Sequence, residues 1–525
     1  MYPKVVLYNG KIYTMDPYRP FAEAVAICGN RIAYVGSTLE VRKLATHDTL
    51  AIDLKGRAVL PGFTDAHIHL VSYALMAGEV DLNGTRSPEE AVERVRRKVV
   101  ETQRGKWVLG RGWDRNLWSK NPRKEELDAV SSDNPVALHS KDGHSLWVNS
   151  LALMYAGITR GTVPPEGGII ERDKETGEPT GILREKAQLL IEKVIPEPSI
   201  GEVEAAVLKA IRELQSFGIT AVTDFEGGFA LKVLQSLQSK GLLGLRITLM
   251  LPVEDMDSLV KLGIRSGFGS EVLQIGGVKI VADGALGSGT AAMLEPYEDE
   301  RWNSGFMRYS RDRLQSLIHK AASNGLNVAV HCIGDRANKV LLDIFEDLKK
   351  AINGGLRHRI EHAQHLTEVD VKRFGELGVV ASVQPIHIAL DMDTIRRRLG
   401  VRGRWAYPFR ALLDGGAILA FGSDAPVERF NPFLGIYTAV TRRRGSNDPE
   451  RWHPEQCITL EEAVRAYTVS GAYANSEDNR RGTISVGKFA DLIVLSRDIF
   501  ETPVEQICEI KVEMTFLDGE VVYKK

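Results

Sequence analysis

The chain has 525 residues, of which 43% are hydrophobic and 26% charged, a balance typical of globular proteins with a substantial core. Its net charge of −2 provides no global basic field, so we expect neither nucleic acid nor a membrane surface as a main partner. The four cysteines include no CxxC motif, which argues against a disulfide framework or a thiolate zinc site. Without a signal peptide or a run of about 18 apolar residues, the expected location is the cytoplasm.

Both ends of the chain show the pattern of short β-strands. Turn signals stand at Asn9-Gly10 and Gly29-Asn30 within the first 55 residues, and at Asp518-Gly519 near the end. Each end alone is too small to bury a stable core. We therefore predict that residues 1–56 and 480–525 together form one composite β-sandwich domain.

Between these ends, apolar strand-like segments alternate with helical patterns. Near-continuous apolar character is typical of parallel strands that are buried on both faces. The count of eight predicts an α/β fold of the (β/α)8 TIM-barrel type over residues 57–80 and 200–479, with a doubly wound sheet as the competing interpretation. The eight segments are 58–70, 219–225, 245–251, 274–284, 327–335, 359–364, 379–385 and 417–426.

Residues 81–199 interrupt this alternation and are predicted to be an insertion subdomain after barrel strand 1 that covers the active site. Their pattern indicates a helix, strand-like segments and a hairpin over GGIIERDKETGEPTGIL. Two arginine runs in the barrel region, 396–398 and 442–444, are interpreted as solvated helix faces, although the second could meet an anionic substrate.

The most informative motif is His67-x-His69 at the end of an apolar strand. Side chains two residues apart in a strand point the same way, so both imidazoles should face the barrel interior. They stand at the carboxyl end of the strand, where active sites of barrel enzymes lie. Two histidines in this arrangement indicate a metal site, although two hydrogen-bonded core histidines would share the pattern.

Three more polar residues end later strands, namely His331, His362 and Asp424. A buried histidine or aspartate at such a point needs a partner, because an isolated buried charge is very costly. Each alone could be a satisfied core residue. Together with the His67-x-His69 pair, they favour one shared site at one end of the barrel.

The motif order PGFTDAHIHL, VKIVADGALGSGTA, VHCIGDRA, RIEHAQ and FGSDAPV resembles the amidohydrolase superfamily over nearly the whole chain. It is most similar to the amidohydrolase-3 branch, which includes N-substituted formamide deformylases. The segments DGHSLWVNS and GILRE in the insertion also resemble that branch. These motifs are specific for the superfamily and the branch, and they do not specify a substrate.

The resemblance implies one or two divalent metal ions, usually zinc. The implied ligands are His67, His69, His331, His362 and Asp424. Lys279 matches the position of a carboxylated lysine that bridges two metals in many members. A lysine inside a barrel strand is desolvated, which lowers its pKa and lets the neutral amine react with carbon dioxide. The alternative is an unmodified Lys279 paired with Asp283, which would favour a single metal ion.

The implied activity is hydrolysis of a C–N bond, of amide or N-formyl type, in a small molecule. Metal would activate a water, and Asp424 would act as general base and acid. Two alternatives stay open: a deaminase or an ester or lactone hydrolase on the same site, and a catalytically inactive regulatory or scaffold protein. A homo-oligomer also stays open, since the sequence identifies no interface.

Further residues are candidates for substrate contact. His144 in the DGHS motif is the candidate that the insertion could bring to the barrel mouth for catalysis. The candidate substrate-binding residues are Trp113, Asp114, Glu185, Asp283, Gln384 and His387, with aromatic packing inside the insertion as the alternative for the tryptophan. Asp283 could instead orient the ligands from behind, as could Arg336.

Overall fold

The computed structural model describes residues 2–351, 355–445 and 448–525. It divides into two compact units. The first comprises the chain up to Tyr73 together with Val207–Lys525, and the second comprises Ala74–Ala206.

The first unit contains a nearly closed barrel of eight parallel strands, whose order around the barrel is their order along the chain. The predicted (β/α)8 fold is therefore confirmed, and the doubly wound alternative is wrong because the strand order nowhere reverses. The ring closes where Asp424 donates its backbone N–H to the carbonyl of His67 (2.7 Å), beside a bridge between Ile68 and Ala425. The strands are β8 (Phe63–Ile68), β15 (Ile219–Asp224), β16 (Arg246–Pro252), β18 (Leu273–Val281), β19 (Asn327–Cys332), β20 (Arg359–His362), β21 (Val380–Val383) and β22 (Ile418–Phe421). The short β17 (Phe268–Gly269) pairs antiparallel with β18.

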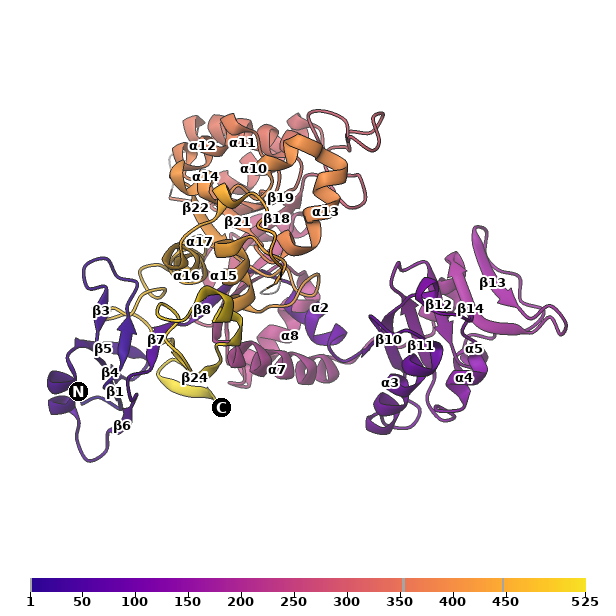
Figure 1. The fold of residues 1–525 in the computed structure, drawn as a ribbon, viewed down its shortest axis with the longest axis horizontal. Helices are drawn as coiled ribbons and strands as arrows, with labels where there is room; N and C mark the ends of the chain where they lie inside the picture. The colour runs from indigo at the N-terminus through magenta and orange to yellow at the C-terminus, as the bar shows by residue number, and fades with distance from the viewer. Residues whose placement is uncertain (1, 352–354, 446–447) are drawn as a thin grey trace. The chain divides into compact units, whose positions relative to one another are not determined.

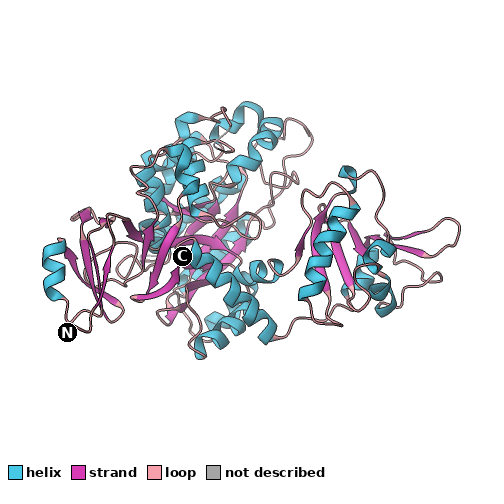
Figure 2. Ribbon diagram, turned by 60° about the horizontal axis from the view of Figure 1, so that its bottom comes forward, coloured by secondary structure: helices cyan, strands magenta, loops and turns pink. Residues whose placement is uncertain are grey.

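Helices surround the barrel strands (Figures 1 and 2). Their ends follow local signals: Thr367 caps the start of α12, and Gly378 ends it in the left-handed conformation. The capping box expected at Thr459 and Glu462 begins α16. The helices are α7 (Ile200–Ser216), α8 (Gly228–Ser239), α9 (Met256–Lys261), α10 (Arg311–Ser323), α11 (Asp335–Ala351), α12 (Glu368–Leu377), α13 (His387–Leu399), α14 (Phe409–Asp414), α15 (Pro432–Thr441), α16 (Leu460–Tyr467) and α17 (Val469–Ala474).

Both chain ends meet in a β structure, as the sequence predicted. A six-stranded sheet has the order β25 (Glu520–Lys524), β24 (Val512–Leu517), β23 (Leu492–Leu495), β7 (Ala58–Pro61), β2 (Lys11–Tyr13) and β3 (Phe21–Ala22). A four-stranded sheet has the order β5 (Arg31–Gly36), β4 (Ala24–Cys28), β1 (Val5–Tyr8) and β6 (Leu50–Asp53), with α1 (Thr38–Leu44) beside it. The two sheets share one apolar core, which includes Val25, Val59 and Phe516. The boundaries at 56 and 480 stay predictions.

One turn in this region has a different role from the expected one. Asn9 lies in the left-handed conformation (φ 54°), as the Asn9-Gly10 signal suggests. However, β1 pairs with β4 and β6, while β2 pairs with β3 and β7, so the turn carries the chain from one sheet to the other instead of closing a hairpin. Gly29-Asn30 and Asp518-Gly519 do join hairpin strands.

The arginine runs are a second correction, because each contains a buried member. Arg442 ends α15 in the left-handed conformation (φ 53°), which turns its side chain inward, where the carbonyls of Trp452, Tyr407 and Ala406 accept its hydrogen bonds. Arg398 is also buried, and it donates to the carbonyl of Gly287. These two arginines bind backbone carbonyls of other segments of the chain and are not part of a solvated face.

The second unit contains the insertion as a six-stranded sheet with helices (Figure 1). Its order is β13 (Gly168–Arg172), β14 (Pro179–Glu185), β12 (Ser145–Val148), β11 (Val136–Ser140), β10 (Val108–Trp113) and β9 (Val80–Asp81). The helices are α3 (Pro88–Glu101), α4 (Lys124–Asp128), α5 (Ser150–Tyr155) and α6 (Leu189–Glu192), and α2 (Leu70–Met76) enters this unit from the barrel side. The predicted hairpin is β13–β14, whereas the boundaries at 81 and 199 and the covering role stay predictions.

No helix among the described residues is long and apolar enough to cross a membrane.

Candidate metal centre

Three of the predicted ligands gather at the carboxyl ends of the barrel strands. His67 comes from β8, His362 from β20, and Asp424 follows β22. Their ligand atoms lie within 4.8 Å of one another, and all three residues are buried. His69 joins them, because its Nε2 atom lies 3.3 Å from Oδ1 of Asp424, while Nε2 of His67 lies 3.6 Å from the same oxygen. The sequence motif and two distant strand ends thus form one cluster.

The Nδ1 atoms of these three histidines are held by oxygen atoms behind them. Nδ1 of His67 lies 2.6 Å from a carboxylate oxygen of Glu361, and Nδ1 of His69 lies 2.9 Å from the carbonyl oxygen of Phe225. Nδ1 of His362 lies 2.8 Å from Oε1 of Gln384. Because these oxygens accept hydrogen bonds, each Nδ1 carries the hydrogen and each Nε2 keeps its lone pair for a metal ion.

His331 lies beside the cluster, but among the described residues it is hydrogen-bonded through Nε2 and not through Nδ1. Its ring is 4.5 Å from that of His362, centroid to centroid. Its Nε2 atom lies 3.1 Å from the carbonyl oxygen of Gly284 and 3.6 Å from Oδ1 of Asp283. With Nε2 donating to that carbonyl, the nitrogen available to a metal ion is Nδ1.

Burial keeps these imidazoles neutral, as metal ligands must be. Desolvation lowers the pKa of His67 to about 3 and that of His331 to about 4, and it holds the pKa of His362 well below its ordinary value. Burial alone would raise the pKa of Asp424, but the surrounding histidines outweigh that effect and hold it far below its ordinary value. His67, His331 and His362 therefore offer neutral nitrogens beside one carboxylate near neutral pH.

Lys279 lies in β18 with its Nζ atom 4.3 Å from the ring centre of Phe225. Burial lowers its pKa to about 8, although the charges of Glu361 and Asp424 act in the opposite direction. Among the described residues it forms no ion pair, so the alternative pairing with Asp283 is not seen. The Asp283 carboxylate instead accepts hydrogen bonds from the backbone N–H groups of Ala292, Ile333 and Gly334.

The structure adds a buried ion pair that the sequence reasoning missed. Arg359 donates to both carboxylate oxygens of Glu361 (2.5 and 3.1 Å), and Glu361 in turn holds His67. Arg359 also donates to the carbonyl of Ala66 and to the hydroxyl of Ser382. Burial raises the pKa of Glu361, but Arg359 and His67 more than offset this and hold it well below its ordinary range. The Arg-x-Glu spacing on one strand was the available signal, since it places both side chains on one face.

The other candidates of the barrel differ in burial and in hydrogen-bond partners. Gln384 is fully buried behind His362, and its Nε2 atom has no hydrogen-bond partner among the described residues. His387 begins α13, and its Nε2 atom likewise has no partner there. Asp283 is fully buried beneath the loops that it binds, while Arg336 donates to the carbonyl of Gly305. These positions suit Asp283 and Arg336 to orienting the site from behind.

The candidates of the insertion lie within the second unit. His144 is largely exposed, and its Nδ1 atom lies 3.2 Å from a carboxylate oxygen of Glu185. Trp113 is buried and stacks on Trp118, with ring centroids 5.6 Å apart, so the aromatic-packing interpretation describes most of its contacts. Trp113 and Asp114 also line a pocket of about 510 Å³ in this unit.

Comparison with known proteins places the chain and its fold in a family. Residues 50–523 match the sequence profile described as "Amidohydrolase family". The chain belongs to the amidohydrolase family. It is 36% identical to Protein LONG AFTER FAR-RED 3 of Arabidopsis thaliana, over 99% of this chain and 91% of that protein. It is 28% identical to an N-substituted formamide deformylase of Arthrobacter pascens, over 99% and 98% of the two chains.

Solved structures agree with this membership. An uncharacterized metal-dependent hydrolase of Pyrococcus furiosus superposes with a TM-score of 0.78 at 32% identity, covering 94% of this chain and 99% of that one. The similarity to a metal-dependent hydrolase of known structure therefore extends over almost the entire chain. The cluster of His67, His69, His362 and Asp424 is the candidate metal site of this family member.

Proposed function

We propose that this amidohydrolase is a metal-dependent hydrolase that cleaves the C–N bond of an amide or N-formyl group in a small molecule. The observation that carries the proposal is the cluster of His67, His69, His362 and Asp424. Nε2 of His67 and Nε2 of His69 lie 3.6 and 3.3 Å from the Asp424 carboxylate, and a ligand atom of His362 lies within 4.8 Å of those of His67 and Asp424. Similarity to a relative named N-substituted formamide deformylase supports the choice of bond.

The donor set fits a divalent transition metal, with zinc as the proposed ion. Imidazole nitrogens and a carboxylate are ligands that zinc accepts, and each histidine is already oriented through its other nitrogen. His67, His69, His362 and Asp424 would hold the ion, and His331 would bind through Nδ1 after small local adjustment. A divalent ion bound there lowers the pKa of a water molecule and polarises the scissile carbonyl.

Asp424 is the proposed general base and acid. Its carboxylate lies beside the histidine cluster, and its lowered pKa keeps it ionised near neutral pH, which is the form that a general base needs. It would take the proton of the attacking water and then deliver it to the leaving nitrogen. The amine product thereby departs neutral, as C–N cleavage requires.

Lys279 is proposed to carry a carboxyl group formed with carbon dioxide. The reaction needs a neutral amine, and the pKa of about 8 leaves an appreciable neutral fraction near neutral pH. The resulting carbamate would bridge two ions and balance their charge. Asp283, which binds three backbone N–H groups instead of Lys279, leaves the lysine available for that reaction.

A substrate and metal screen tests the proposal. Purified protein loaded with zinc, manganese or cobalt is assayed against N-formyl compounds, N-acyl amino acids and cyclic amides, with esters, lactones and amino-substituted heterocycles in parallel. Release of an amine together with a carboxylate or formate supports the proposal. Turnover of only esters or lactones, or release of only ammonia from a heterocycle, would favour the second enzyme class. Protein that binds no metal and cleaves none of these compounds would favour an inactive regulatory or scaffold role.

The insertion is proposed to contribute residues to substrate binding. Its contributions would come from His144, Glu185, Trp113 and Asp114, while Gln384 and His387 would contact substrate from the barrel itself. Alanine substitution of each residue in turn, followed by steady-state kinetics on the substrate that the screen identifies, distinguishes contact residues from packing residues. A residue whose replacement leaves both kcat and KM unchanged is removed from the site.

A further inference from the structure

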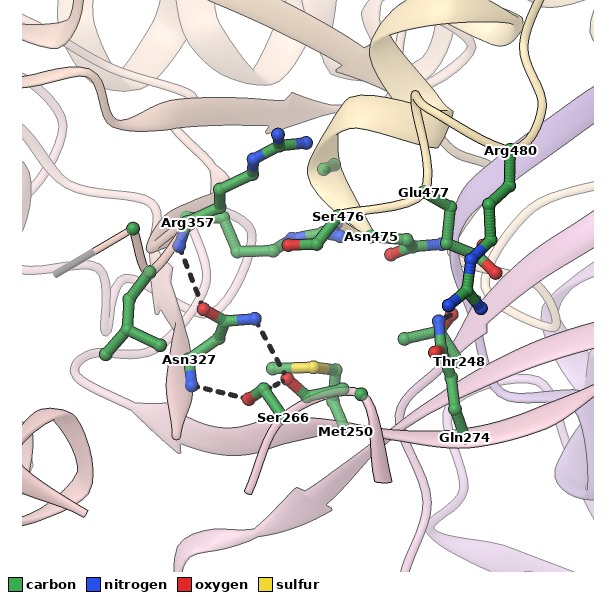
Figure 3. Close-up of a pocket in the computed structure, with 16 residues that line it drawn as sticks. Thr248, Met250, Ser266, Gln274, Asn327, Arg357, Asn475, Ser476, Glu477 and Arg480 are labelled. Carbon is green, nitrogen blue, oxygen red and sulfur yellow. Dashed lines mark hydrogen bonds between the residues drawn. The ribbon is translucent and has the colours of Figure 1, made fainter. Parts of the chain in front are cut away.

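A second cavity lies at the opposite ends of the barrel strands from the metal centre. It has a volume of about 290 Å³ and is lined by residues at or near the beginning of β16, β18, β19 and β20, together with the segment that follows α17. Figure 3 shows Asn475 and Glu477 on one side of it and Met250 and Ser266 on the other. Its size is near the lower limit of ordinary small-molecule sites.

An unpartnered amide group lines this cavity. The Asn475 side chain is 7% exposed, and its Oδ1 atom accepts a hydrogen bond from the hydroxyl of Thr223 at 2.9 Å. In this orientation of the amide, Nδ2 has no hydrogen-bond partner among the described residues. A buried donor without a partner costs free energy, and a bound acceptor would recover it.

Arg359 brings a guanidinium group to the same cavity. Its Nε and Nη2 atoms are committed to Glu361, Ala66 and Ser382. Among the described residues, its Nη1 atom has a single hydrogen-bond partner, the hydroxyl of Thr223 at 3.5 Å, a distance at the limit for such a bond. Because Nη1 carries two hydrogens, at least one of them is available to a ligand.

The charges around the cavity leave one positive charge in excess. Arg357 is paired with Asp478 at 2.5 Å, Glu477 with Arg481 at 2.7 Å, and Arg359 with Glu361. Arg480, which also lines the cavity, has no ion-pair partner among the described residues. A ligand with a single negative charge would therefore leave the cavity neutral, whereas a dianion would leave it negative.

We infer that this cavity is a binding site for a small monocarboxylate, held by Asn475, Arg480 and the free edge of Arg359. The planar guanidinium groups and the amide match the two oxygens of a carboxylate. The apolar side chain of Met250 lies beside the remaining space and would contact the hydrocarbon part of the ligand. Asn475 and Arg480 are neither ligands of the hydrolytic cluster nor hydrogen-bond partners of those ligands. Arg359 connects the two sites, because it also pairs with Glu361, which holds His67.

Calorimetric titration of the metal-loaded full-length protein tests the inference, with acetate, butyrate and benzoate as probes and inorganic phosphate as the dianionic comparison. Arg480→Gln removes the excess charge at an exposed position. Asn475→Asp keeps the acceptor for Thr223 while placing a fixed carboxylate in the cavity. Arg301→Gln is the matched control, because Arg301 is an exposed arginine whose only ion-pair partner within the described part of the chain is Glu298, at 4.0 Å.

We expect saturable binding of at least one monocarboxylate to the wild-type protein and to Arg301→Gln. Arg480→Gln should weaken that binding roughly tenfold or more, and Asn475→Asp should abolish it. Wild-type protein that binds no probe at millimolar concentration would overturn the inference. Equal binding by the wild type and both cavity variants would also overturn it, because the carboxylate would then bind elsewhere, as at the metal centre. Tighter binding of phosphate than of any carboxylate would overturn it as well. None of these readouts depends on hydrolysis, so failure here is distinguishable from failure of the proposed function.

Discussion

Replacing Glu361 by Gln should separate two roles of the buried ion pair that supports His67. The substitution keeps the shape of the side chain, but it removes the charge that faces Arg359 at 2.5 Å and the carboxylate that faces Nδ1 of His67 at 2.6 Å. Both partners are about 1% exposed, so water cannot replace the lost charge. Leaving Arg359 unpaired should lower the free energy of unfolding by about 3 kcal/mol. Weakening the support of a ligand histidine should reduce metal affinity by roughly tenfold to a hundredfold.

Two assays and one control variant test this reasoning. Urea unfolding of chelator-treated protein reports stability, and competition with a chromophoric chelator reports metal affinity. Asp491→Asn is the control, because Asp491 faces the buried Arg246 at 2.6 Å where β16 begins, at the opposite end of the barrel strands from the cluster. Arg246 also keeps Asp518 as a partner at 2.6 Å, so the loss of stability should be smaller. This control should lose stability without losing metal affinity. The double variant Arg359→Met with Glu361→Gln should regain stability but not metal affinity. Wild-type metal affinity in Glu361→Gln would refute the reasoning.

Three further predictions concern the site and its pH dependence. Asp424→Asn should lower turnover by at least about a hundredfold while metal stays largely bound, as metal analysis and amine release would show; full activity would remove the general-base role. Lys279→Met should lower the number of divalent ions per chain, measured by elemental analysis, and carbon dioxide depletion should do the same to the wild type; no change in either would indicate an unmodified lysine. His358 has a pKa lowered by burial to about 4 from 6.5, so its stabilising contribution is complete above pH 6.5 and is lost as pH falls towards 4. Between pH 8 and pH 5 that loss is about 2 kcal/mol. Over this range, the unfolding free energy of the metal-free wild type should therefore fall by about 2 kcal/mol more than that of metal-free His358→Leu. Parallel plots of unfolding free energy against pH for the two proteins would contradict the assignment.

The meeting of the histidines and the aspartate was largely predictable, because it follows from geometry that every parallel barrel shares. Alternation along β8 places His67 and His69 on one side, and the carboxyl ends of all eight strands meet at one rim. A histidine or aspartate at the end of any strand must therefore lie near the others. His362 and Asp424 were found in this way without knowledge of the packing.

The supporting interactions were not predictable, because they depend on which distant side chains face one another. Glu361 reaches His67 across the barrel interior from β20, and no local pattern encodes that contact. The Asn9-Gly10 signal specified a turn but not the sheets that its strands join. Arg442 looked solvated within a basic run, yet its left-handed backbone turns it toward buried carbonyls. In each case a tertiary contact decided the outcome where the local pattern allowed several.

Metal titration of the chelator-treated protein, followed by the rate of amine release from N-formyl and N-acyl compounds, tests the central claim most directly. We predict no turnover without metal and a rate that rises in proportion to the ion bound. His67→Ala should lose both the bound ion and the turnover. Turnover that persists in metal-free protein would contradict the metal-dependent mechanism. Metal-loaded protein that hydrolyses esters or lactones while leaving every amide and formamide intact would contradict C–N cleavage.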